Sequence, residues 1–426
     1  MLQISLIRQQ PNLVKERLSH RNFSGIYLVD EILKLDEAIR EKKSASESVQ
    51  AQINALSKEI GVFMAKGDKA GAEARKADVA TLKSNSAADK TALEELENEL
   101  QKNLLLLPNL PNELVPKGVS AEDNVVVLQG GSIPELSKDA KPHWEIIKDF
   151  DLISFELGAK LTGSGFPVYK GQGAKLQRAL IQYFLNYNTG AGYSEFMPPL
   201  MVNEATAYGT GQLPDKEGQM YHITVDGFYM IPTAEVPVTN VYRDEIIAAD
   251  SLPVKMTAYT PCFRREAGSF GSDVRGLNRV HQFDKVEIIQ LTRPENSYNT
   301  LEEMVNHVER LIQFLELPYR ILRLCGGDMG FTSALTYDFE VYSAAQKKWL
   351  EVSSVSNFET FQTNRMKIRF KDDSGKTQLL HSLNGSSLAL PRIVAALLEN
   401  NQLGDIIKLP RVLHEYFGAP HISLPA

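Results

Sequence analysis

Residues 263–287 read FRREAGSFGSDVRGLNRVHQFDKVE, and this stretch decides how the rest of the chain is interpreted. It predicts two strands joined by a glycine-rich, charged loop. Because strand side chains alternate between faces, Arg264 and Glu266 should share one face of the first strand, and Phe283 and Glu287 one face of the second. If the strands pair as a hairpin, one sheet surface offers a guanidinium, an aromatic ring and two carboxylates. That set suits a nucleotide phosphate, its base and a cationic amine.

The bulk composition is that of an ordinary globular protein. The chain has 426 residues, 43% of them hydrophobic and 23% charged, so two or three domains are expected. No run of about 18 apolar residues indicates a membrane span, and the N-terminus lacks the pattern of a secretory signal. We therefore expect a cytoplasmic protein without membrane contact. The net charge of −7 argues against broad nucleic-acid coating, although it leaves room for a local basic surface.

The two cysteines, Cys262 and Cys325, are predicted to be buried thiols rather than a disulfide. Two cysteines cannot form a zinc cluster by themselves.

Residues from about 28 to 107 are predicted to form an antiparallel coiled-coil hairpin. Seam positions, most of them apolar, recur at alternating spacings of four and three from Leu35 to Phe63, and of three and four from Ala72 to Leu107. A turn at 67–71 separates the two series. At about 1.5 Å per residue the arm would be roughly 50 Å long. Several seam positions are polar, which predicts only moderate stability.

The distal half of this arm is richer in lysine and arginine than in acidic residues, whereas residues 94–99 make its return helix acidic. A charge run on a coiled coil is usually a solvated face. The alternative is a long lever that contacts a polyanion through its distal half.

Prolines and glycines between 108 and 118 end the second helix and predict a linker over 108–134. From 135 to 426, strand-like runs alternate with helical ones. The expected strands are 227–231, 259–266, 280–290 and 348–352, and the expected helices are 176–187, 295–317 and 393–401. Antiparallel hairpins with helices on one side indicate an α+β fold rather than a doubly wound parallel sheet.

Each candidate side chain in this region also has an ordinary structural interpretation. Arg264, just before the loop segment Gly268-Ser269-Phe270-Gly271, can grip a phosphate with two parallel hydrogen bonds or form a surface ion pair with Glu266. Arg265 should point the other way. Phe283 can stack on a base, although most strand phenylalanines belong to a core.

Two further segments carry hydroxyls and carboxylates. Thr233 and Glu235, in the rigid PTAEVP segment, could bind an ammonium group or form a turn or helix N-cap. Glu351 precedes Ser353 and Ser354, and a carboxylate with a hydroxyl suits Mg²⁺ beside phosphates. Strict alternation pairs Glu351 with Ser353, so the use of Ser354 would require a bulge or a turn.

Arg392 follows the segment LNGSSLALP at the start of a predicted helix, where Pro391 suits the first turn. A positive charge there opposes the helix dipole, which favours an anionic ligand over an exposed surface arginine. The chain contains no Walker-type loop, no strand-to-helix GxGxxG and no HExxH. An ATP site would therefore have to use arginines on an antiparallel sheet.

Taken together, these segments resemble the bacterial-type seryl-tRNA synthetases, which are class II aminoacyl-tRNA synthetases. The segments PNLP, VPKG, HWEI, GSGF, YGTGQLP, TAEVP, FRREAGS, RGLNRVHQFDKVE, EVSSVSN, LNGSSLALPR and ENNQ follow the order of that family along nearly the whole chain. The resemblance implies an N-terminal tRNA-binding domain over 1–107 and a class II catalytic domain over 135–426, with a six- or seven-stranded antiparallel sheet. It also implies a homodimer that pairs through residues 192–200, in which the motif proline is Pro198, with the adjacent Pro199 as the alternative.

The resemblance implies a two-step serine–tRNA ligase reaction. The carboxylate of L-serine attacks the α-phosphate of ATP to give seryl-adenylate and pyrophosphate, and the serine then passes to the 3′ end of tRNA(Ser). The family suggests that tRNA(Sec) is charged as well. Mg²⁺ accompanies ATP, and the zinc-dependent subtype is disfavoured because its cysteine ligands are absent. The arm would reach across the dimer to the long variable arm of the tRNA.

The resemblance further implies roles for individual residues. Arg264 would bridge the α-phosphate and the carboxylate of serine, Phe283 would stack on adenine, and Arg392 would contact the γ-phosphate. The implied serine pocket is Thr233, Ala234, Glu235, Arg264, Glu287 and Ser386. The implied ATP site is Arg264, Arg265, Glu266, Phe283, Glu351, Val352, Ser353, Ser354 and Arg392. Glu351 and Ser354 would hold the metal.

Two departures and two alternatives remain. The chain has FRRE where many members have FRSE, and Ser387 and Pro391 replace two glycines of the third motif, which leaves the geometry of that loop open. A class II-like ligase that loads a carrier protein is one alternative, although such relatives lack the long arm. The other is a non-catalytic coiled-coil scaffold that binds tRNA, which the intact arginines and carboxylates oppose.

Overall fold

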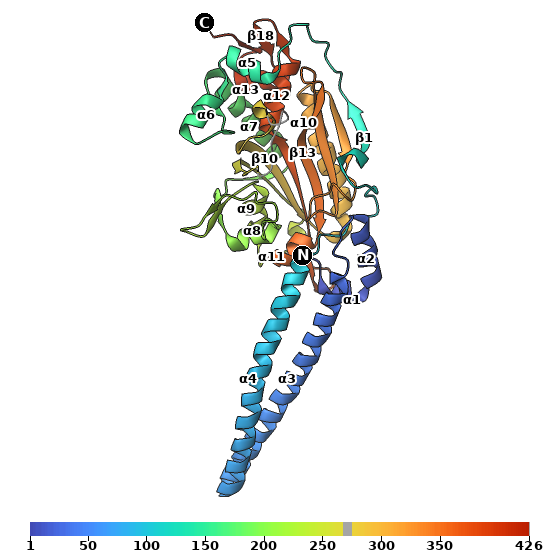
Figure 1. Cartoon of the computed structure of the whole chain (residues 1–426), viewed down its shortest axis with the longest axis vertical. Coiled ribbons are helices and arrows are strands. Elements are labelled where there is room, and N and C mark those ends of the chain that lie inside the picture. Colours follow the sequence, from blue (N-terminus) through green and yellow to red (C-terminus); the bar gives the residue numbers. More distant parts are fainter. Residues whose placement is uncertain (267–274, 426) are drawn as a thin grey trace. The chain divides into compact units, whose positions relative to one another are not determined.

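The computed structural model describes residues 1–266 and 275–425 (Figure 1). The predicted loop segment 268–271 lies outside the described residues. Contacts divide the chain into two compact units. The first comprises Met1–Ser19 and Phe23–Pro108, and the second comprises His20–Asn22 and Asn109–Ala426.

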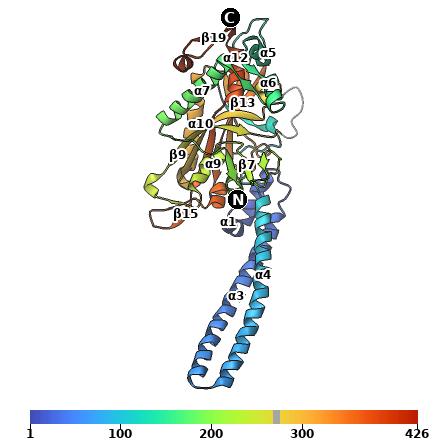
Figure 2. The ribbon, with the colours of Figure 1, turned by 90° about the vertical axis from the view of Figure 1, so that its left-hand side faces the viewer.

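The first unit is dominated by two 38-residue helices, α3 (Leu28–Ala65) and α4 (Lys69–Leu106), preceded by α1 (Ile4–Gln9) and α2 (Pro11–His20). The two long helices lie side by side in both views (Figures 1 and 2). Gly67 adopts a φ of 77° in the turn between them, a value that glycine reaches without strain. Asp68 then caps α4, because its side chain accepts a 2.9 Å hydrogen bond from the Gly71 amide. The predicted helical hairpin is confirmed.

The seam of this hairpin is apolar in places and polar in others, as its sequence indicates. Ile39, Ile53, Ala72 and Val79 are buried. A polar pair interrupts them, because Lys42 Nζ and Asp89 Oδ1 lie 3.3 Å apart across the two helices, both substantially exposed. Exposed pairs of this kind contribute only about 0–1 kcal/mol each. The apolar seam residues therefore supply most of the stability of the arm.

The second unit is built on an eight-stranded sheet. Its strand order is β1 (Val125–Gly130), β11 (Tyr319–Arg323), β12 (Leu335–Ser343), β13 (Lys348–Glu359), β16 (His381–Ala389), β10 (Gln282–Thr292), β9 (Val254–Phe263) and β4 (Ser194–Phe196). Neighbouring strands are antiparallel except for β4, which runs parallel to β9. The antiparallel α+β class is confirmed.

The count of six or seven strands, and the plain linker over 108–134, were both wrong. The run Val125–Leu128 has high β-propensity and pairs through its backbone with β11 at the edge of the sheet. Its side chains are mostly exposed, so no alternating pattern marks it in the sequence.

One face of the sheet is covered by α7 (Gly171–Gly190), α10 (Ser297–Phe314) and α12 (Leu390–Asn400). The apolar sides of these helices pack against inward-facing strand residues such as Val286 and Ile288 in one large core. Because β10 alternates, residues 283, 285 and 287 point to the opposite face. The apolar packing on one side thus leaves the other side available for polar side chains.

Smaller elements complete this unit. They are α5 (His143–Asp149), β2 (Ile153–Ser154), α6 (Phe155–Leu161), β3 (Val168–Tyr169), β5 (Met201–Asn203), α8 (Glu204–Thr210), β6 (His222–Ile223), β7 (Phe228–Met230), α9 (Glu235–Thr239), β8 (Ile246–Ile247), α11 (Phe361–Met366), β14 (Arg369–Lys371), β15 (Thr377–Leu379), β17 (Gln402–Leu403), β18 (Ile406–Lys408), α13 (His414–Phe417) and β19 (His421–Ser423). Cys262 and Cys325 are buried free thiols, as predicted. Among the described helices, none is long and apolar enough to span a bilayer.

Candidate functional site

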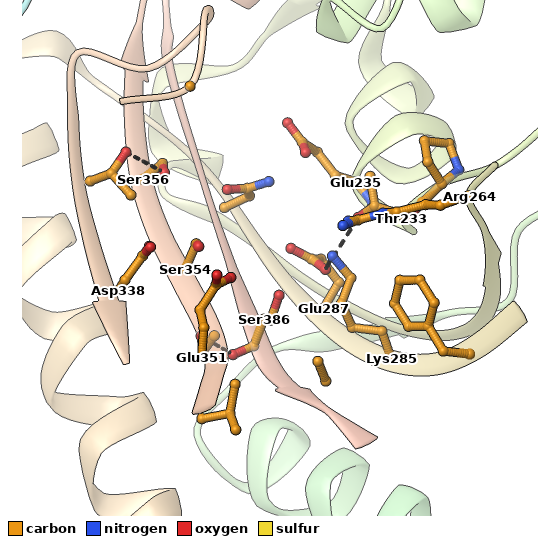
Figure 3. Close-up of a pocket in the computed structure, with 18 of the residues that line it drawn as sticks. Thr233, Glu235, Arg264, Lys285, Glu287, Asp338, Glu351, Ser354, Ser356 and Ser386 are labelled. Atoms are coloured by element: carbon orange, nitrogen blue, oxygen red, sulfur yellow. Dashed lines mark hydrogen bonds and ion pairs between the residues drawn. The ribbon is translucent and has the colours of Figure 1, made fainter. Parts of the chain in front are cut away.

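The second unit contains a cavity of about 670 Å³ on the polar face of the sheet (Figure 3). It collects residues from β10, β12, β13 and β16, from the segment just after β9, and from the starts of α9 and α12. The predicted site residues that line it are Thr233, Glu235, Arg264, Glu266, Phe283, Glu287, Glu351, Val352, Ser353, Ser354, Ser386 and Arg392. Two predicted residues do not line it: Ala234 is buried in a neighbouring apolar cluster, and Arg265 is exposed.

Arg264 enters the cavity from a position just beyond the first strand. The prediction that β9 carries both Arg264 and Glu266 on one face was wrong, because the strand ends at Phe263 and Glu266 has a φ of 48°. The turn separates the two side chains, and Glu266 pairs instead with Arg279 at 3.0 Å. The Arg264 guanidinium lies 5.2 Å from the centre of the Phe283 ring, and its Nε donates to the Pro232 carbonyl at 3.4 Å. The arginine is therefore held at the cavity wall by an aromatic face and a main-chain oxygen.

Beside Arg264 lies a buried acidic pair, Glu235 and Glu287. The Thr233 hydroxyl donates to Glu287 Oε2 at 3.3 Å, and Lys285 Nζ lies 2.6 Å from the same oxygen. Burial, reinforced by Glu287, raises the pKa of Glu235 to about 7, while a hydrogen bond from Gln362 opposes the shift. Burial also raises the pKa of Glu287, although Lys285 counteracts it. The pocket thus has a surplus of buried acid, and a cationic ammonium would relieve it.

The structural alternative for Thr233 is present as well. Its hydroxyl accepts a 3.3 Å hydrogen bond from the Glu235 amide at the start of α9. One side chain therefore both shapes the helix start and orients the Glu287 carboxylate.

Lys285 is a site residue that the sequence reasoning missed. It lies between Phe283 and Glu287 in the alternation of β10 and shares their face. The alternation that predicts a shared face for Phe283 and Glu287 also predicts that Lys285 lies on it, so the sequence carried the signal for this residue. Its ammonium pairs with Glu287 inside the cavity wall, where only 8% of the lysine side chain is exposed.

Glu351 and Ser354 share the cavity because of a β-bulge. The register of β12 against β13 shifts so that Phe339 faces Ser353 while Glu340 faces Glu351. Val352 is the extra residue, and both Glu351 and Ser354 consequently point to the cavity (Figure 3). The predicted strand 348–352 in fact continues to Glu359.

Asp338 of β12 faces this pair and was also missed. It pairs across the ladder with Ser354, and the segment LTYDFEVYS alternates polar and apolar residues, which was its signal. Burial raises the pKa of Asp338 well above its ordinary value, and the negative charge of Glu351 raises it further. Its buried Oδ1 has no hydrogen-bond partner in the described part of the chain.

These oxygen atoms fit a hard cation. Glu351, Ser354 and Asp338 supply carboxylate and hydroxyl donors, and Mg²⁺ is commonly held by one or two carboxylates together with substrate phosphates. Within residues 1–266 and 275–425, no group of three or more His, Cys, Asp or Glu side chains is arranged to bind a metal alone.

Arg392 lines the cavity beside Glu351. Its Nη1 donates to the Glu351 carbonyl at 2.7 Å, and its Nε donates to the Asn278 carbonyl at 3.1 Å. The Glu351 carboxylate lies 3.7 Å from the guanidinium. Two main-chain oxygens thus fix the direction of this arginine, which is not a loose surface residue.

The segment before Arg392, predicted as a loop of open geometry, is the strand β16, and α12 begins three residues earlier than predicted, at Leu390. Gly385 allows β16 to approach β13, because a Cβ there would lie 2.9 Å from Val355 Cγ2. Ser386 is paired in register with Glu287 and joins it on the cavity face.

The sequence and the fold of this chain are similar to those of known proteins. Residues 1–111 match the model described as the seryl-tRNA synthetase N-terminal domain, and residues 221–401 match the tRNA synthetase class II core domain (G, H, P, S and T). A protein named serine–tRNA ligase from Salinibacter ruber is 49% identical over 428 residues, with 100% of both chains covered. One of the same name from Methylacidiphilum infernorum is 47% identical over 98% of this chain and 99% of its own. The chain belongs to the seryl-tRNA synthetase family.

A solved structure supports the same assignment. The crystal structure of seryl-tRNA synthetase from Pyrococcus horikoshii complexed with ATP matches this fold with a TM-score of 0.93 at 33% identity, and each chain is covered completely. The predicted family, class II fold and enzyme class, an aminoacyl-tRNA synthetase, are confirmed.

Proposed function

We propose that this chain activates L-serine with ATP and transfers the serine to the 3′ end of tRNA(Ser). The observation that carries the proposal is the placement of Arg264, Arg392 and the Glu235–Glu287 pair around one cavity. Two guanidinium groups suit a bent triphosphate, and the acidic pair suits the ammonium of a small amino acid. The family membership of the chain supports the same reaction.

The proposed chemistry depends on positioning and charge stabilisation. Arg264 would bind the carboxylate of serine and the α-phosphate together, which holds the attacking oxygen close to phosphorus. Phe283 would stack on adenine, and Arg392 would hold the γ-phosphate. As the carboxylate attacks, negative charge grows on the α-phosphate oxygens next to Arg264, and pyrophosphate leaves toward Arg392. The reaction needs no covalent bond to the enzyme.

Selectivity for serine would come from Thr233, Glu235, Glu287 and Ser386. The carboxylates would hold the ammonium and accept a hydrogen bond from the serine hydroxyl. Alanine would leave these buried polar groups unpaired, and a site built for a hydroxyl rejects the analogue that lacks one.

Glu351 and Ser354, with the buried Oδ1 of Asp338 beside them, would hold Mg²⁺ against the phosphates. When bound, the ion would neutralise phosphate charge and help the triphosphate to bend. Val352 and Ser353 would contribute to the ATP site indirectly, because the bulge that they form orients the Glu351 and Ser354 side chains toward the cavity. Glu266 would contact ATP from the other wall.

The remaining assignments are proposals of the same kind. The arm over 28–107, within the domain 1–107, would contact the long variable arm of tRNA(Ser), and tRNA(Sec) would be charged too. The catalytic domain would comprise 135–426 and pair as a homodimer through residues 192–200. A cytoplasmic location remains a prediction. Arg265 and Ala234 would make no direct contact with ATP or serine, because neither lines the cavity.

The direct test is aminoacylation of total tRNA with each of the twenty amino acids, together with exchange of pyrophosphate into ATP. We expect charging and exchange with serine, and no more than background with alanine. Exchange supported by threonine but not by serine would overturn the substrate assignment.

A further inference from the structure

A buried histidine–glutamate pair lies behind the cavity and joins α5 to α12. His143 and Glu399 both have fully buried side chains. Glu399 Oε1 lies 2.6 Å from His143 Nδ1 and accepts a 2.8 Å hydrogen bond from the His143 amide. None of the roles proposed above for the cavity uses this pair.

The hydrogen bonds define where the protons lie. The Leu277 amide donates to His143 Nε2 at 2.8 Å, so Nε2 is the acceptor nitrogen. The ring proton is therefore on Nδ1 and points to Glu399. The Glu399 carboxylate also accepts from Gln346 Nε2 at 2.8 Å and from the Ser343 hydroxyl. A buried carboxylate with this many donors is fully satisfied and holds the imidazole in one tautomer and one direction.

This pair connects to the cavity through the 3₁₀ turn Gly276–Asn278. The turn is pressed against the imidazole, because a Cβ on Gly276 would lie 2.3 Å from His143 Nε2. Asn278 is the last residue of this turn, and its main-chain carbonyl accepts the 3.1 Å hydrogen bond from Arg392 Nε. The Asn278 side chain returns to the network by donating to Gln346 Oε1 at 3.0 Å.

We propose that His143 and Glu399 are positioning residues for ATP. The imidazole fixes the Leu277 amide, the fixed turn presents the Asn278 carbonyl, and that carbonyl aims Arg392 into the cavity. The inference rests on the proposed assignment of Arg392 to the triphosphate. A merely structural role would link α5 to α12 and affect stability without selecting one substrate.

Two substitutions separate these roles, because each keeps a different half of the histidine. The Gln amide oxygen in His143→Gln stands near the position of Nε2 and can accept from the Leu277 amide. The Asn amide nitrogen in His143→Asn stands near Nδ1 and can donate to Glu399, but it leaves the Leu277 amide without its acceptor. His414→Gln is the matched control, since His414 is a half-buried histidine that bonds a main-chain carbonyl, that of Leu409.

The measurements are the Kd of MgATP by equilibrium dialysis and the KM values of ATP and serine in pyrophosphate exchange, on the whole chain. We expect His143→Asn to raise the Kd of MgATP by ~10-fold, and His143→Gln by less than ~3-fold, with the KM of serine within ~2-fold of the parent in both. His414→Gln should change none of them. Gln346→Ala removes only the side chain that joins Glu399 to Asn278, and it should raise the Kd of MgATP by ~3-fold. This variant tests the proposal if the histidine variants fail to fold.

The inference is overturned if His143→Asn and His143→Gln weaken MgATP equally, or if neither weakens it, or if serine is affected as much as ATP. Arg392→Ala distinguishes the proposal from its foundation. If that variant binds MgATP normally, the assignment of Arg392 fails, and the inference fails with it. If Arg392→Ala weakens MgATP and His143→Asn adds nothing further in the Arg392→Ala background, the two residues act through one contact, as proposed.

Discussion

The helical arm and the catalytic cavity use charge in opposite ways. In the arm, ion pairs such as Lys42–Asp89 and Arg75–Glu59 join two adjacent helices at exposed positions, where each can be lost at small cost. In the cavity, Lys285 and Glu287 are almost completely buried and share their surroundings with Glu235. Charges that are buried together depend on one another, so changing one alters the rest. We therefore expect the loss of a single charge to change stability little in the arm, and to change substrate binding or stability strongly in the cavity.

The largest expected effect is that of Arg264→Ala. Loss of the guanidinium removes the group that would bridge serine and the α-phosphate, and kcat/KM for serine-dependent pyrophosphate exchange should fall by ~10³-fold. The fold should be retained, as measured by circular dichroism. Arg293→Ala is the matched control, because Arg293 follows the same strand pair and lies outside the cavity. Equal losses in the two variants would contradict a specific role for Arg264.

The second prediction concerns the arm. Removing residues 52–65 and 69–82 takes two heptads from each helix and keeps the native turn 66–68 in phase with the seam. Because the cavity belongs to the other unit, pyrophosphate exchange should stay within ~2-fold of the parent, while kcat/KM for tRNA charging should fall by ~10²-fold. Charging at the parental rate would refute the role of the arm.

The third prediction uses the raised pKa of Glu235, which is about 7. Below pH 7 this carboxyl is protonated and offers no negative charge to the ammonium of serine. The KM of serine should therefore rise as pH falls through 7, by up to ~10-fold per pH unit. The KM of ATP serves as the internal reference and should rise less. Glu235→Gln should have a high KM for serine at every pH, and a pH dependence that persists unchanged in this variant would exclude Glu235 as its source.

The same group makes a prediction about stability. The folded-state pKa lies above the unfolded-state value, so the buried charge destabilises the fold at high pH, fully so above pH 7. This cost disappears as pH falls below the ordinary value of 4.5. Glu235→Gln should thus increase the free energy of unfolding by about 3 kcal/mol at pH 8 and by much less at pH 5. Urea denaturation at the two pH values measures it, and an equal change at both would contradict the assignment.

The smallest effect is expected for Lys42→Ala in the arm. The side chain pairs with Asp89 at an exposed position, so the free energy of unfolding should fall by less than ~1 kcal/mol, and less still at high salt. Ile53→Ala, at a buried seam position, should cost more than Lys42→Ala. If Lys42→Ala is the more damaging of the two, the arm depends on charge in the same way as the cavity.

The difference between the two regions also explains what could be predicted from the sequence. The arm is a local repeat, so spacings of three and four located both helices and the turn at Gly67. The face shared by Phe283 and Glu287 followed from alternation within one strand. Arg264 lines the cavity, but it was wrongly assigned to the strand, because a turn after Phe263 has no periodic signal. The sequence showed only that a bulge or a turn is needed if Glu351 and Ser354 are to share a face. It could not place the bulge at Val352, since the register depends on the partner strand.

Non-local partners were the part that could not be predicted. Asp338 and Ser354 meet only because β12 pairs with β13, and the sequence does not state that pairing. The contact of Glu399 with His143 joins residues 256 positions apart. Edge strand β1 was missed for another reason, because its side chains are mostly exposed and the sequence therefore carries no alternation of polar and apolar residues.

The central claim is that Arg264 and Arg392 bind one triphosphate beside a pocket for serine. The most direct test is a crystal structure of the chain with serine and a non-hydrolysable ATP analogue. The account predicts adenine stacked on Phe283, phosphate oxygens within about 3 Å of both guanidinium groups, and the serine ammonium against Glu235 and Glu287. A nucleotide bound elsewhere, with Arg392 still engaged only by Glu351 and Asn278, would contradict it.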